Sequence, residues 1–198
     1  AMLANSKAQL NQEKLNMAFA SIQQQMQEGN INLGAYITAT YQRFEIDDQN
    51  GFNYKSLFQL ANIANSTGAY SNDYYSVNLF FEEKIKTIEA TRSENAKEFP
   101  YKVDLMISMA NIYLRKKQFD KSLAYISKAE TTLEQCVVEF KQRKIMQVQT
   151  LTALNLNYTG KYEKAIKILS EVSSLDNTSL RIAPLHLALA IFLFQQGD

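Results

Sequence analysis

Gly160-Lys161 is the pair of residues in this chain whose types could bind a phosphate, since a Gly-Lys step occurs in loops that cradle nucleotide phosphates. Such a loop needs an earlier Gly, a Ser or Thr directly after the Lys, and a β-strand leading into it. Here Tyr162 follows the Lys, the earlier Gly is missing, and the flanking residues have helical spacing. We therefore interpret Gly160 as a corner between two helices.

The acidic stretch 47–51 (Asp-Asp-Gln-Asn-Gly) has some of the residue types of a calcium-binding loop. When Gly51 is aligned with the invariant Gly of that loop, Ile46 takes the first ligand position. Leu57 then stands where a bidentate Glu belongs. A turn between two helices explains these residues better than a metal site.

The remaining candidates for chemistry are single residues. Cys136 is the one cysteine, so no intramolecular disulfide can form, and with His186 as the one histidine a His-based metal site has too few ligands. The acidic pairs, such as Glu82-Glu83, are sequence neighbours that point apart on a helix. We expect no catalytic residues, no metal, no cofactor and no enzyme activity.

The composition indicates a helical protein. The chain has 198 residues, of which 46% are hydrophobic, with 2 Pro and 6 Gly, too few for a protein of many short strands. The net charge of +1 gives no long-range attraction to nucleic acid, and no apolar run approaches the roughly 20 residues that span a bilayer. We expect an all-α, cytoplasmic protein that binds neither nucleic acid nor membrane.

Apolar residues recur at three- and four-residue spacing along most of the chain, which locates the helices. Helices are expected over about 5–28, 33–45, 54–66, 72–91, 100–117 and 161–173, with a last one from about Arg181. The stretch from Asp120 to Tyr158 lacks Gly and Pro but is unusually long for one helix, so we expect a break between Thr131 and Val138.

The corner at Gly160 recurs along the chain. Seven residues before it is the small Ala153, four before it is Leu156, two after it is Tyr162, and five after it is the small Ala165. Other corners repeat all or part of this pattern: Lys117 with Ala110, Tyr113, Phe119 and Ser122; Gly197 with Ala190 and Leu193; Gly68 with Ala61, Ala64 and Tyr70; and, faintly, Gly29 with Ile31 and Gly34.

This pattern has a physical reason. Two antiparallel helices approach closely only where small residues face each other near the corner, and a larger residue one turn away fills the space between them. The corner itself needs a residue that tolerates a left-handed backbone, which favours Gly.

These units resemble tetratricopeptide repeats. The match is good over 103–129 and 148–172 and partial over 57–77 and 181–198, although the corners are 39, 49, 43 and 37 residues apart, against a usual repeat of 34. The resemblance implies a right-handed superhelical α-solenoid of antiparallel helical hairpins, in a single domain spanning 1–198. Related helical-hairpin families with longer periods stay open. We also expect the chain to be part of a longer protein, from which a leader could have been removed.

The resemblance also implies a partner-binding concave face. In such arrays the residues one and four positions beyond the small residue of each first helix face inward. Those positions are Asn62, Asn65, Asn111, Leu114, Leu154, Asn157, Ile191 and Phe194. A side-chain amide can both donate to and accept from a peptide backbone, so we expect a protein or peptide partner. The opposing interpretation is that Asn is common throughout this chain.

Other interpretations remain open at this stage. One is a ligand-sensing domain of a peptide-responsive transcriptional regulator, which would need a DNA-binding domain ahead of Ala1. Basic patches such as Arg115-Lys116-Lys117 are expected to be solvated helix ends, and the aromatic stretch 74–81 is expected to pack rather than stack on a ligand. Apolar residues near the C-terminal end predict self-association through that end, because helical arrays normally need a polar capping helix.

Overall fold

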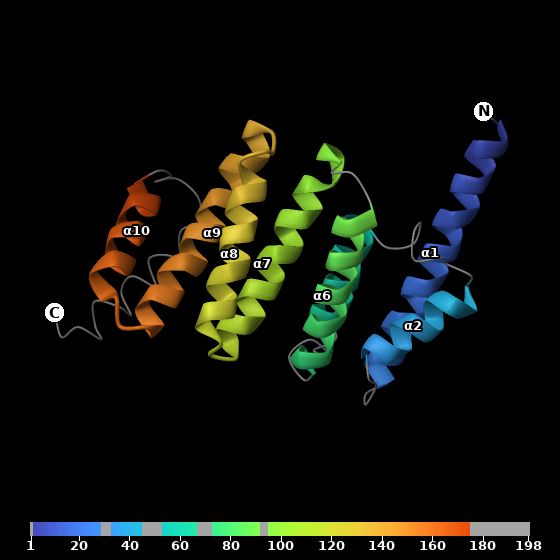
Figure 1. Ribbon diagram of the computed structural model, residues 1–198, viewed down its shortest axis with the longest axis horizontal. Coiled ribbons are helices and arrows are strands. Elements are labelled where there is room, and N and C mark those ends of the chain that lie inside the picture. The colour runs from blue at the N-terminus through green and yellow to red at the C-terminus, as the bar shows by residue number, and fades with distance from the viewer. Residues whose placement is uncertain (1, 29–32, 45–52, 67–72, 92–94, 175–198) are drawn as a thin grey trace. The chain divides into compact units, whose positions relative to one another are not determined.

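Every element of the computed structural model is a helix (Figure 1). The structure describes residues 2–28, 33–44, 53–66, 73–91 and 95–174, and within these ranges no strand occurs. This confirms the all-α prediction. None of the helices in these ranges combines the length and the apolar character needed to cross a membrane.

The chain divides into two compact units, residues 1–105 and 106–198, with the boundary inside α7 (Phe99–Arg115). Unit 1 contains α1 (Met2–Glu28), α2 (Leu33–Arg43), α4 (Tyr54–Ser66), α6 (Tyr74–Thr91) and a short 3-10 helix (Ala96–Glu98). Unit 2 contains the end of α7, α8 (Phe119–Leu133), α9 (Val138–Tyr158) and α10 (Tyr162–Ser174).

The helix boundaries lie within about three residues of those predicted from periodicity. The predicted break between Thr131 and Val138 is confirmed, since α8 ends at Leu133 and α9 begins at Val138. The last predicted helix, from Arg181, lies outside the described residues.

In unit 1, α1 and α2 pack against each other around buried apolar side chains that include Ile22 and Ile37. The Ser21 hydroxyl lies 3.0 Å from the Tyr36 hydroxyl and links the two helices at the edge of this contact. Burial raises the pKa of the Tyr41 phenol well above its ordinary value, because the ionised form would lose its hydration.

Helix α4 begins with a reciprocal cap between Asn53 and Ser56. The Ser56 backbone N–H donates to Asn53 Oδ1 at 2.8 Å, and the Asn53 backbone N–H donates to Ser56 Oγ at 2.9 Å. Two backbone donors that no helical partner can satisfy are thereby paired, which explains why the helix starts at Tyr54.

The aromatic stretch at the start of α6 is divided between core and surface. Phe81 is fully buried and meets Phe80 edge to face, with ring centroids 5.7 Å apart. Tyr75, by contrast, is 64% exposed. The two Phe residues pack as expected, whereas Tyr75 lies on the opposite side of the helix and does not.

In unit 2, two corners share the same left-handed geometry. Lys117 has φ +59° and Gly160 has φ +77°. After α7, the N–H of Lys117 donates to Leu114 O (2.9 Å) and that of Gln118 to Tyr113 O (2.9 Å). The N–H groups of Gly160 and Lys161 make the equivalent bonds to Asn157 O (3.0 Å) and Leu156 O (2.8 Å) after α9. This is the Schellman pattern, which satisfies the last carbonyls of each helix and reverses the chain.

In unit 2, the small residues of the repeated pattern are buried at both of the described corners. Ala110 and Ser122 in the first hairpin, and Ala153 and Ala165 in the second, have no exposed surface. In the second hairpin, Ala153 and Ala165 belong to one apolar cluster with Leu169 and Val172. Small side chains therefore occupy buried positions between the paired helices, as close helix packing requires.

Exchanging the corner residues should change stability in opposite directions. A Cβ at Gly160 would meet nothing within 4 Å, so Gly160→Ala should cost about 1 kcal/mol from backbone strain alone. Lys117→Gly should raise the free energy of unfolding by about 0.5–1 kcal/mol, since Gly adopts the left-handed backbone without strain. Urea denaturation followed by circular dichroism measures both changes, and a loss of stability in Lys117→Gly would contradict this account.

Enlarging a small contact residue should destabilise the second hairpin. Ala165→Trp inserts a large ring into a fully buried position and should cost roughly 1–3 kcal/mol or more through overpacking. The same substitution at Ala124, which is exposed on α8, is the matched control and should change the free energy of unfolding by less than about 0.5 kcal/mol. Equal effects at the two positions would contradict the close helix contact.

Candidate functional site

The predicted partner-binding residues of unit 2 differ in how far they are exposed. Asn111 on α7 and Leu154 on α9 are half-buried, so part of each side chain reaches the surface. Leu114 and Asn157, one turn further along the same helices, are only 6% and 7% exposed. The first pair is therefore partly accessible to a partner, although Leu154 also packs against the apolar cluster of Ala153 and Ala165, whereas the second pair lies beneath the surface.

In unit 1, the predicted residues Asn62 and Asn65 are both exposed on α4. Both are exposed although their sequence neighbours Ala61 and Ala64 are buried in the core. Ile191 and Phe194 lie outside the described residues.

Asn157 contributes a buried acceptor that has no hydrogen-bond partner. Its Oδ1 is inaccessible to solvent and unpaired, and so is Oε1 of Gln149, two turns earlier on α9. Ala153 lies midway between them and packs against α10. At the matching positions of α7 the chain has Met106 and Leu114, which are buried and apolar. Burying an unpaired carbonyl is energetically costly. At these two positions α9 carries that cost, whereas α7 has apolar side chains and does not.

A second buried amide, Asn155, joins the two hairpins. Its Nδ2 donates to Ser122 Oγ on α8 at 3.0 Å and to Leu151 O at 2.9 Å. The Ser122 hydroxyl in turn donates to Ala110 O on α7 at 2.8 Å. Three consecutive helices are thereby linked through one serine. Sequence reasoning treated Ser122 only as a small residue and did not single out Asn155, although a polar residue at a buried helical spacing was the available signal.

The ionisable groups of the described residues do not converge on a site. No group of three His, Cys, Asp or Glu side chains in this part of the chain is placed to hold a metal ion. Cys136 is half-buried, and its thiol donates to Thr132 O at 3.5 Å. Burial raises the pKa of the Glu130 carboxyl, which lies on α8 and is not among the predicted residues. The arrangement offers hydrogen bonding and packing.

Comparison of the chain with protein-family models, with curated proteins and with solved structures gave no match in any of the three.

The hydrogen bond between Ser122 and Asn155 should appear as an energetic coupling. Ser122→Ala and Asn155→Ala should each destabilise the protein, and the double variant should lose less than their sum, with a coupling of about 0.5–1.5 kcal/mol. Urea denaturation of the four proteins measures this coupling. Ser122→Ala combined with Thr131→Ala, an exposed position on α8, is the control and should be additive. Additivity in the Ser122–Asn155 pair would contradict the link between the hairpins.

Proposed function

We propose that the chain is a tetratricopeptide-like array of helical hairpins that binds another protein or a peptide. The observation that carries the proposal is the matched pair of corners in unit 2, each with a left-handed residue, the same two hydrogen bonds and a buried small residue five positions later. Hairpins that repeat in this way stack side by side, and their first helices line a concave surface.

The contact between successive hairpins supports the proposal further. Helix α8 ends the first hairpin and α9 begins the second, and the two run antiparallel in Figure 1. Asn155 on α9 reaches Ser122 on α8, so the second hairpin is held against the first by a buried polar contact as well as by packing. A continued array of this kind would form a right-handed superhelix.

The recognition chemistry that we assign to the concave face is that of an extended or helical peptide. Asn111 and Leu154 occupy the same position in the two hairpins, and both remain partly accessible. The amide pairs with peptide N–H and C=O groups, and the leucine offers apolar contact. Asn62 and Asn65 present the same amide chemistry in unit 1. Leu114 and Asn157, being buried, shape the surface from beneath.

Selection of binding peptides from a displayed library on the full chain tests this function. Affinities of the selected peptides are then measured by fluorescence anisotropy for the parent and for the double variant Asn111→Arg with Leu154→Arg. Two long cations on the proposed surface should weaken binding at least about tenfold, since few residues of an interface carry most of its energy.

The matched control is Ala124→Arg with Ser127→Arg, which places two arginines on the exposed face of α8, the second helix of the first hairpin. Its affinity should stay within about twofold of the parent. Circular dichroism verifies that both variants keep their helix content. Peptides that bind the Asn111/Leu154 variant as tightly as the parent would show that this surface is not the binding face.

A further inference from the structure

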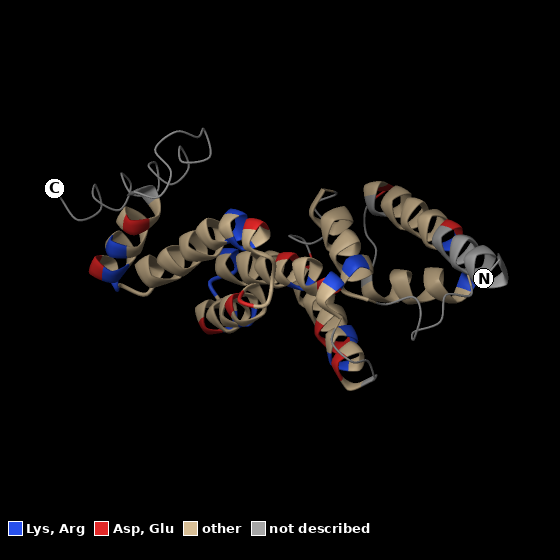
Figure 2. Cartoon of the chain, turned by 90° about the horizontal axis from the view of Figure 1, so that it is seen from above, with Lys and Arg blue, Asp and Glu red and all other residues tan. Residues whose placement is uncertain are grey.

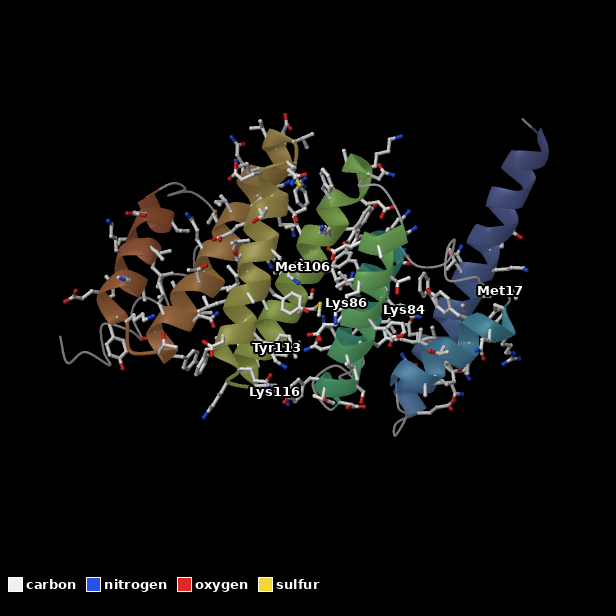
Figure 3. The ribbon with its side chains drawn as sticks, in the orientation of Figure 1. Met17, Lys84, Lys86, Met106, Tyr113 and Lys116 are labelled. Atoms are coloured by element: carbon white, nitrogen blue, oxygen red, sulfur yellow. The ribbon has the colours of Figure 1, made fainter. Side chains whose placement is uncertain are left out.

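A second surface of unit 2 lies at the end of the hairpins where both corners are found. We call it the corner edge and define it as residues 115–121 and 158–164. The start of α8 and the end of α9 meet there, because the Phe119 and Tyr158 rings stack with centroids 5.8 Å apart and planes within 12°. Figure 3 shows Tyr113 in the last turn of α7 and Lys116 just after the helix, leading into this edge.

The corner edge exposes aromatic surface. Tyr158 is 60% exposed although it stacks on Phe119, and Tyr162, the first residue of α10, is 39% exposed. In the first hairpin, the residue matching Tyr162 is Phe119, which is covered by Tyr158 of the next hairpin. Exposed rings favour contact with a partner, since aromatic side chains carry much of the energy of protein interfaces.

The corner edge is also positively charged. It contains six Lys and Arg side chains and two carboxylates, hence a net charge of +4, whereas the whole chain carries +1. Blue residues mark the passage from α9 to α10 in Figure 2. Among the described residues, neither Asp120 nor Glu163 forms an ion pair with Lys117 or Lys161. The two carboxylates of the edge therefore leave Lys117 and Lys161 available to a partner.

One cationic residue of the corner edge, Lys117, has a strained backbone conformation. Lys117 adopts φ +59°, a left-handed conformation that a residue with a Cβ rarely takes, and the matching residue of the next corner is Gly160. The Lys117 side chain is exposed, so packing inside the protein does not explain why a lysine occupies this strained position. Backbone strain of this kind is typical of positions whose side chain takes part in binding or catalysis.

From these observations we propose that the corner edge binds an acidic, aromatic-containing linear peptide of a partner protein. Carboxylates of the peptide pair with Lys117 and Lys161, and its apolar side chains lie on Tyr158 and Tyr162. The observations favour a peptide over a nucleic acid. The Phe119 and Tyr158 rings already stack on each other and leave no gap for a base, and the sequence pI of 7.9 is below that of typical nucleic-acid-binding domains.

The test uses the full chain and a short labelled peptide in which Glu alternates with Tyr. Fluorescence anisotropy should show binding that weakens as salt is added, because exposed charges are screened. A peptide with Gln in place of Glu should bind much more weakly. The variant Lys117→Gly with Lys161→Gln should bind the acidic peptide about fivefold more weakly. Since Lys117→Gly relieves backbone strain, its melting temperature should rise while its affinity falls.

The charge-matched control is Lys128→Gln with Arg143→Gln, which removes two exposed cations away from the corners on the same helices. It should bind the acidic peptide within about twofold of the parent. The Asn111/Leu154 variant should also bind normally, so this proposal stands or falls separately from the concave-face function. Equal binding of the Gln peptide, equal binding by the Lys117/Lys161 variant, or tighter binding of a labelled oligothymidylate would overturn it. A salt-sensitive dimer that the Lys117/Lys161 substitutions dissociate would assign the edge to a second copy and overturn it too.

Discussion

The left-handed residue at the end of α7 and of α9 is the constraint on which the rest of unit 2 depends. A helix can be followed at once by an antiparallel partner only if one residue reverses the chain while the last carbonyls stay paired. Gly160 does so without steric cost, whereas Lys117 does so under strain. With the reversal set there, Ala110 and Ala153 lie seven residues back and are fully buried.

Packing and polar contacts have different roles in this unit. The apolar cluster around Ala165 and Leu169 supplies burial, which is favourable but does not select a single alignment of one helix on another. The bonds from Asn155 to Ser122 and from Ser122 to Ala110 are directional and buried, so a shift of one residue would leave polar groups unpaired. Unit 1 is held differently, with a capping box at the start of α4 and the buried Phe81 on α6.

The two proposed surfaces of unit 2 follow from the same hairpin geometry but offer different chemistry. First-helix residues beyond the small position, such as Asn111 and Leu154, present amide and apolar groups along the helices. The corners gather helix ends, where charged side chains remain solvated, and Lys161 and the Tyr158 ring lie there. A hairpin array can therefore carry one surface suited to peptide backbone and another suited to negative charge.

The sequence by itself determined the helices and the corners. Apolar periodicity located the break before Val138, and the alignment of Lys117 with Gly160 identified two positions that share a left-handed backbone. Both features depend on residues close in the chain. The tertiary structure decided which side chains contact each other across helices. Periodicity shows which face of α9 carries Asn155, but it does not show that Ser122 on α8 lies within hydrogen-bond distance of it. For the same reason Asn157, predicted to face a partner, is buried in the fold, because burial depends on the elements that other parts of the chain bring to a position.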